Sequence, residues 1–199
     1  MLIKKEFSYK TVINKSVFLA IVRHIDNEQS FKDFVSETRK KYYDADHVVS
    51  AFKCGSLQRS SDDGEPSGTA GVPILNMLMK SELEEVAVLV VRYFGGVKLG
   101  ASNLLRAYLN TATECIKQAP KVEDVLMYSY QLVLSYDKAS KLEHALNQMA
   151  YEIRKDYDLN VTFNILSEKQ INDEITNLCK GDWVSFKELD KTLVLKDII

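Results

Sequence analysis

One run of residues limits the possible folds of this 199-residue chain more than any other: residues 85–92 read EVAVLVVR. A strand with one solvated face alternates apolar and polar residues, whereas a strand covered on both faces is continuously apolar. The run therefore predicts a central strand in a sheet that other elements cover on both faces. Its aliphatic core is far shorter than the about 20 residues that a membrane-spanning helix needs. We therefore expect no membrane partner.

The patterns on either side of this run predict a mixed α and β domain that ends at Pro120. Runs rich in β-branched and aromatic residues predict strands, and apolar residues at helical spacing predict helices. Residues 55–68 are polar and rich in Gly and Ser, so we expect a loop there. Thr69 is the expected N-cap of the helix that follows, with Pro73 tolerated in the first turn. The expected elements are strands at 16–23, 47–53 and 85–92, and helices at 28–42, 69–80 and 102–118.

The pattern changes after Pro120, and the remaining residues predict a second domain. The order of the expected elements is βαββαβ, which is the signature of a ferredoxin-like domain. Gly181 is the expected stop of its second helix. The sequence thus predicts an α+β protein with domains at 1–120 and 121–199. The elements expected in the second domain are strands at 126–135, 151–157, 160–166 and 183–195, and helices at 137–149 and 168–180.

Charge and cysteine content exclude several classes of protein. The chain has 26 basic and 28 acidic residues, so it lacks the basic excess typical of strong electrostatic nucleic-acid binders. Cys54, Cys115 and Cys179 lie far apart and form no CxxC pair, so neither a disulfide framework nor a zinc site is indicated. The N-terminal residues contain no apolar signal-peptide segment. We therefore expect a cytoplasmic protein.

An acidic loop at residues 60–71 (SSDDGEPSGTAG) is the first candidate site. Its carboxylates, Asp62, Asp63 and Glu65, could hold Mg²⁺, which prefers oxygen ligands. Hydroxyls and backbone amides that lead into a helix could hold a phosphate. The alternative is purely structural: a tight Asp-Gly turn followed by a capped helix start. No other cofactor is expected.

A glycine loop directly after the apolar strand is the second candidate site. A strand, a glycine loop and a helix in this order resemble the cradles in which backbone N–H groups approach a phosphate. Basic side chains would add positive charge there, and two aromatic rings could stack on bases. Alternatively, the aromatic rings fill the core and the glycines permit positive φ or close packing. The candidate residues are Arg92, Tyr93, Phe94, Gly95, Gly96, Lys98, Gly100 and Arg106.

His47 is a further candidate, but isolated strand histidines are more often packed and hydrogen-bonded than catalytic. A dyad with Cys54 would need the two side chains to meet across seven residues of one strand, roughly 23 Å. No HExxH or GxSxG motif is present. The sequence therefore indicates no recognisable hydrolase chemistry.

Taken together, these segments resemble the IMPACT/YigZ family over about residues 5–120. The segments that carry the resemblance are Lys15-Ser16 with Phe18, 45–47 with 51–52, 61–66 with 68–71 and Pro73, and 91–96 with 99–100 and 106–108. The chain departs from the family pattern at Val17, Ser102 and Asn103. The resemblance implies a first domain like domain IV of elongation factor G and like a domain of a small-subunit ribosomal protein. It also implies a second domain like another domain of that elongation factor.

Three functions remain open from the sequence. The first is an accessory factor that binds RNA or ribosomes and modulates translation, through the glycine loop and its basic and aromatic residues. The second is an enzyme acting on a nucleotide or a phosphorylated small molecule with Mg²⁺. The third is a protein-interaction module that contacts a protein partner through the acidic loop.

Overall fold

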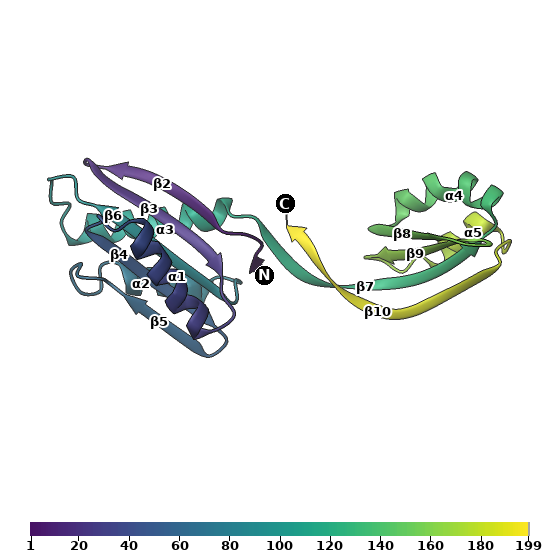
Figure 1. The fold of residues 1–199 in the computed structure, drawn as a ribbon, viewed down its shortest axis with the longest axis horizontal. Helices are drawn as coiled ribbons and strands as arrows, with labels where there is room; N and C mark the ends of the chain where they lie inside the picture. Colours follow the sequence, from purple (N-terminus) through teal and green to yellow (C-terminus); the bar gives the residue numbers. More distant parts are fainter. Residues whose placement is uncertain (199) are drawn as a thin grey trace. The chain divides into compact units, whose positions relative to one another are not determined.

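The computed structural model describes residues 1–198, which form two compact units (Figure 1). The first unit comprises Met1–Glu123 with Asp197 and Ile198, and the second comprises Asp124–Lys196. The division falls after Glu123, inside strand β7 (Lys121–Leu134). The predicted α+β fold class is confirmed.

The first unit is built on a five-stranded antiparallel sheet with the order β2-β3-β6-β4-β5. Strand β6 (Val86–Tyr93) lies at its centre, and every residue from Val86 to Arg92 is buried. The continuous apolar run therefore has the predicted cause, because both faces of this strand are covered. The other strands are β2 (Phe7–Ile13), β3 (Ser16–His24), β4 (His47–Cys54) and β5 (Leu57–Ser61).

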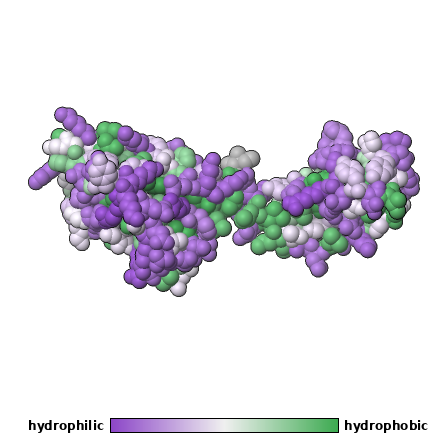
Figure 2. Space-filling view, viewed as in Figure 1, coloured by the Kyte–Doolittle hydropathy of each residue, from purple (hydrophilic) through white to green (hydrophobic). Residues whose placement is uncertain are grey.

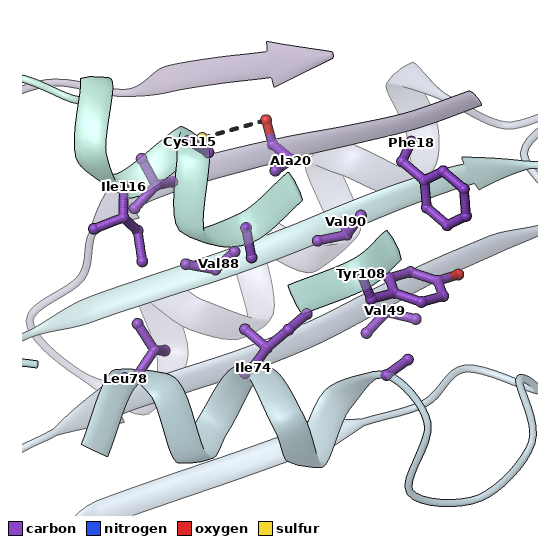
Figure 3. Packing of buried hydrophobic residues seen from close by; sticks show 14 of the residues in the cluster. Phe18, Ala20, Val49, Ile74, Leu78, Val88, Val90, Tyr108, Cys115 and Ile116 are labelled. Carbon is purple, nitrogen blue, oxygen red and sulfur yellow. Dashed lines mark hydrogen bonds between the residues drawn. The ribbon is translucent and has the colours of Figure 1, made fainter. Parts of the chain in front are cut away.

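Helices cover both faces of this sheet. Helices α2 (Gly71–Lys80) and α3 (Ala101–Gln118) pack on one face, where Val88 and Val90 of β6 point. Figure 3 shows this side, with Ile74 of α2 and Tyr108 of α3 directed toward the strands. Helix α1 (Glu28–Lys41) covers the other face, over the alternate residues of β6. Strand β6 is thus covered on both faces, and its C-terminal end leads into the glycine loop that precedes α3.

The predicted loop at residues 55–68 is partly wrong, because β5 lies within it. This edge strand pairs with β4 from Cys54↔Leu57 to Ser50↔Ser61. Four of its five side chains are exposed, so it carries no apolar signal. Its backbone hydrogen bonds to β4, rather than burial of its side chains, hold it in the sheet.

The second unit has the predicted βαββαβ order, formed by β7, α4, β8, β9, α5 and β10. Strand β7 lies between β10 and β9, and β8 pairs with β9, which gives the order β10-β7-β9-β8. Helix α5 is shorter than predicted and ends at Cys179, followed by the left-handed C-cap Lys180 and then Gly181. The bounds are α4 (Tyr136–Met149), β8 (Glu152–Tyr157), β9 (Val161–Ser167), α5 (Asn172–Cys179) and β10 (Ser185–Ile198).

A short strand β1 (Leu2–Ile3) pairs with the start of β7, through Leu2↔Val122 and Ile3↔Lys121. Hydrophilic side chains cover most of the visible face of the first unit (Figure 2). Across residues 1–198, no helix combines the length and the apolar character needed to cross a membrane.

Candidate functional site

A pocket of about 340 Å³ opens in the first unit where β6 ends and α3 begins. Its volume is at the lower end of the range for small-ligand sites. Residues of the acidic loop and the glycine loop meet in its wall, although they are far apart in the sequence. The lining residues are Glu65, Pro66, Arg92, Phe94, Lys98, Leu99, Gly100, Ala101 and Leu104.

A buried polar cluster forms one part of this wall. Arg92 is only 5% exposed, and its Nη1 lies 2.5 Å from Oε1 of Glu65. The hydroxyl of Tyr108 donates a hydrogen bond of 2.6 Å to the same oxygen. Burial and the Glu65 carboxylate raise the pKa of Tyr108, so its hydroxyl stays protonated as a donor. Arg92 is therefore paired with Glu65 inside the domain and is not exposed on its outer surface.

His47 borders this cluster and is hydrogen-bonded rather than free. Its Nδ1 lies 2.7 Å from the carbonyl oxygen of Asp63, and its Nε2 lies 3.8 Å from Oε1 of Glu65. Cys54 occupies the opposite end of β4, so the two side chains do not form a dyad. His47 thus links the acidic loop to the strand that carries it.

Asp62 organises the start of α2. One carboxylate oxygen accepts hydrogen bonds from the N–H groups of Ala70 and Gly71, and the other accepts from the N–H of Gly68. The prediction that Thr69 caps this helix is wrong, because its hydroxyl donates instead to the carbonyl of Pro66. Asp62, which lies outside the helix, thus accepts hydrogen bonds from the N–H groups at the start of α2 that an N-cap side chain would otherwise pair.

Asp63 is also held by protein donors. It accepts a hydrogen bond of 2.5 Å from the N–H of Val48 and forms an ion pair with Arg39. Burial acts to raise the pKa of Asp63, but these partners outweigh it and leave the pKa below its ordinary value. All three carboxylates of the acidic loop therefore have structural partners. Residues 1–198 contain no group of three or more His, Cys, Asp or Glu side chains placed to hold a metal ion.

The glycine loop is shaped by close packing at Gly95. A Cβ atom on this residue would lie 2.1 Å from the carbonyl carbon of Lys15, so no other amino acid fits without displacing backbone. Gly96 and Gly100 differ, because both have positive φ and open space around the missing side chain. The structural explanation thus fits all three glycines, Gly95 through close packing and Gly96 and Gly100 through positive φ.

The two aromatic residues of the loop differ, because Tyr93 packs against the core and Phe94 lies at the surface. The Phe94 side chain is 46% exposed beside the pocket, and its backbone N–H donates to Asp46. Tyr93 is half-buried and its hydroxyl donates to Asp44. Phe94 is therefore the ring that an external base can reach.

The remaining basic candidates, Lys98 and Arg106, are both exposed. Lys98 lines the pocket and Arg106 does not. The three predicted cations therefore lie in different places. Arg92 is in an internal ion pair, Lys98 is at the pocket rim, and Arg106 is on the outer surface of α3.

Several residues of this site carried no functional signal in the sequence. Tyr108 had no predicted role, although a buried tyrosine hydroxyl usually needs a hydrogen-bond partner. Arg39 had no signal, because its link to Asp63 depends on the packing of α1 against β4. Leu99, Ala101 and Leu104 carried no sign of a pocket, which forms only where the glycine loop turns into α3.

Comparisons with known proteins identify the family. The family model described as the Impact N-terminal domain matches residues 14–116. IMPACT family member YvyE of Bacillus subtilis (strain 168) is 35% identical over 175 residues, which cover 85% of this chain and 81% of that protein. IMPACT family member YigZ of Escherichia coli (strain K12) is 36% identical over 141 residues, which cover 68% and 69%.

A solved structure shares the fold over nearly the whole chain. It is described as the crystal structure of an hypothetical protein, is 28% identical, and superposes with a TM-score of 0.60 over 95% of both chains. The family match, the two relatives and this shared fold agree: the chain belongs to the IMPACT family.

Proposed function

We propose that this protein is an accessory factor that binds RNA or ribosomes and modulates translation. The observation that carries the proposal is the loop between β6 and α3, which presents the exposed ring of Phe94 next to the exposed amine of Lys98. An aromatic face beside a cation is the combination that single-stranded RNA requires. The contact surface is therefore Phe94, Lys98 and the first turn of α3.

The physical chemistry of this surface suits a local contact. A base stacks on an aromatic ring whatever its sequence, and a lysine with helix-terminal N–H groups binds backbone phosphate. The chain as a whole has a net charge of −2, so binding must come from such a local arrangement rather than from overall attraction. Binding through a few phosphates gives a moderate dependence on salt.

Family membership supports the same function by analogy. The resemblance described above relates the first domain to a domain of elongation factor G and to one of a small-subunit ribosomal protein. A shared fold is weaker support than a site, so the proposal depends on the loop and not on the fold alone.

The two other functions lose the features that suggested them. The enzyme hypothesis needed Asp62, Asp63 and Glu65 to hold Mg²⁺, but each already accepts hydrogen bonds or an ion pair from the protein. The interaction-module hypothesis needed the same carboxylates to face a partner. Metal ligation or a partner contact through these carboxylates would compete with the start of α2 and with the buried pair at Arg92.

Co-sedimentation with ribosomes across a salt series tests the proposal. We expect binding near physiological salt, and a loss of roughly tenfold or more in the double variant Phe94→Ala, Lys98→Gln, because stacking on a ring contributes about 1–3 kcal/mol per base. The matched control is Tyr157→Ala, Lys141→Gln, which removes an exposed ring and an exposed lysine from the second unit. Unchanged binding in the first variant would refute the assigned surface.

A further inference from the structure

We infer that the pocket beside Phe94 binds one nucleoside monophosphate unit, either free or as part of an RNA strand. The phosphate lies at the first turn of α3, and the nucleoside lies against the apolar wall. This assignment rests on the proposed function only where the nucleotide belongs to RNA. It specifies the chemistry of the pocket, whereas the proposed function specifies the assembly that the protein joins.

The first turn of α3 offers unpaired donors. This helix has 18 residues, and its N-cap is Gly100, which has no side chain to accept a hydrogen bond. Among residues 1–198, no protein acceptor pairs with the N–H groups of Ala101, Ser102 or Asn103. The neighbouring helix α2 differs, because Asp62 occupies its first amides. An anion at α3 would thus take the place that a carboxylate holds at α2.

A buried cation in the pocket wall gives independent support. Arg92 is 5% exposed, yet its Nε has no hydrogen-bond partner within the described part of the chain. This Nε is itself closed off from solvent, so the support comes from the charge: Arg92 lines the pocket and places a buried guanidinium in its wall. Its Nη1 already neutralises Glu65, and that carboxylate therefore does not leave the pocket with a net negative charge. Lys98 at the rim adds a second cation.

The apolar part of the lining indicates more than a simple anion. Pro66, Phe94, Leu99 and Leu104 line the pocket together with the charged residues. Sites for small molecules combine a mostly apolar wall with a few polar groups that fix orientation. Inorganic phosphate would leave this wall uncovered, whereas a nucleoside would cover it, with its base on the exposed ring of Phe94.

The pocket also allows a variant that separates binding from folding. Ala101 is exposed, lines the pocket and is the first residue of α3. A carboxylate at the start of a helix is favourable, so Ala101→Glu keeps the fold. The same carboxylate repels a bound phosphate. Ala101→Gln has nearly the same size without the charge, and it is the matched control.

Calorimetric titration with adenosine monophosphate, adenosine and inorganic phosphate tests the inference. We expect adenosine monophosphate to bind at least tenfold more tightly than either fragment. We also expect a loss of roughly tenfold or more in Ala101→Glu and in Lys98→Gln, with Ala101→Gln close to wild type. Equal binding of adenosine and its monophosphate, or unchanged binding in Ala101→Glu, would overturn the inference.

A short single-stranded RNA, titrated in parallel, separates the two sources of the nucleotide. Binding of the mononucleotide assigns a free ligand to the pocket, and binding of the RNA alone assigns a strand. If neither ligand binds the wild-type protein, the inference fails, whatever the ribosomes do. If a nucleotide binds but the protein does not co-sediment with ribosomes, the proposed function fails and the pocket assignment stands.

Discussion

Replacing Glu65 with glutamine should destabilise the first unit by about 3 kcal/mol. Glu65 and Arg92 have side-chain exposures of 3% and 6%, and their closest atoms lie 2.5 Å apart. Removing one member of a buried ion pair typically costs 3–5 kcal/mol, because the other charge remains buried without compensation. Glutamine can still accept hydrogen bonds from Arg92 and Tyr108, so we expect the lower end of that range.

Urea denaturation of the full chain measures this loss. Trp183 is the only tryptophan and belongs to the second unit, so its fluorescence reports that unit while circular dichroism reports both. The Glu65→Gln variant should shift the transition seen by circular dichroism and leave the fluorescence transition in place. Because domains are typically stable by only about 5–15 kcal/mol, the shift should be large.

Two comparisons separate the ion pair from other effects. Glu114→Gln removes the exposed pair with Lys117, and we expect it to cost less than about 0.5 kcal/mol. The double variant Glu65→Leu, Arg92→Met should recover most of the stability, because an apolar pair leaves no buried charge. A loss below about 1 kcal/mol in Glu65→Gln would refute this account of the cluster.

Three further outcomes follow from the structure. Gly95→Ala should cost at least 1–3 kcal/mol in urea denaturation, since its Cβ would lie 2.1 Å from backbone; an unchanged midpoint would contradict the packing. The pKa of Asp63 is lowered in the folded state, so Asp63→Asn should be destabilising above about pH 4. The difference in unfolding free energy between this variant and wild type should shrink as the pH falls below the ordinary pKa of 3.8. A difference that does not change with pH would contradict the pairing. Cys54 is half-buried while the other two cysteines are buried, so a thiol reagent should modify one cysteine rapidly in the native protein and all three in urea; rapid native modification of all three would be inconsistent with this fold.

The sequence predicted those elements whose side chains follow a strong pattern. The apolar run of β6 is continuous because helices cover both faces of its sheet, so the pattern indicated both the strand and its central position. Strand β5 was missed because it lies at an edge with exposed side chains, and backbone pairing alone defines it. The same limit applies wherever hydrogen bonds of the main chain, and not side-chain burial, decide the structure.

The sequence predicted where the site lies, but not which of its side chains contact one another. The acidic and glycine loops were both identified, yet only the fold brings Glu65 to Arg92, which changes that arginine from a surface cation to a buried one. Thr69 looked like a helix cap by its position, but Asp62 takes this role through a loop that returns to the helix start. Such contacts depend on the three-dimensional path of the chain and leave no periodic signal.

The proposed function requires that Phe94 lies against RNA when the protein is bound to ribosomes. A photoreactive phenylalanine analogue placed at position 94 tests it directly, with the same analogue in place of Tyr157 as the control on the second unit. We predict that irradiation of the co-sedimented complex links position 94 to ribosomal RNA, in higher yield than position 157. Co-sedimentation without any link from position 94 to RNA would contradict the claim.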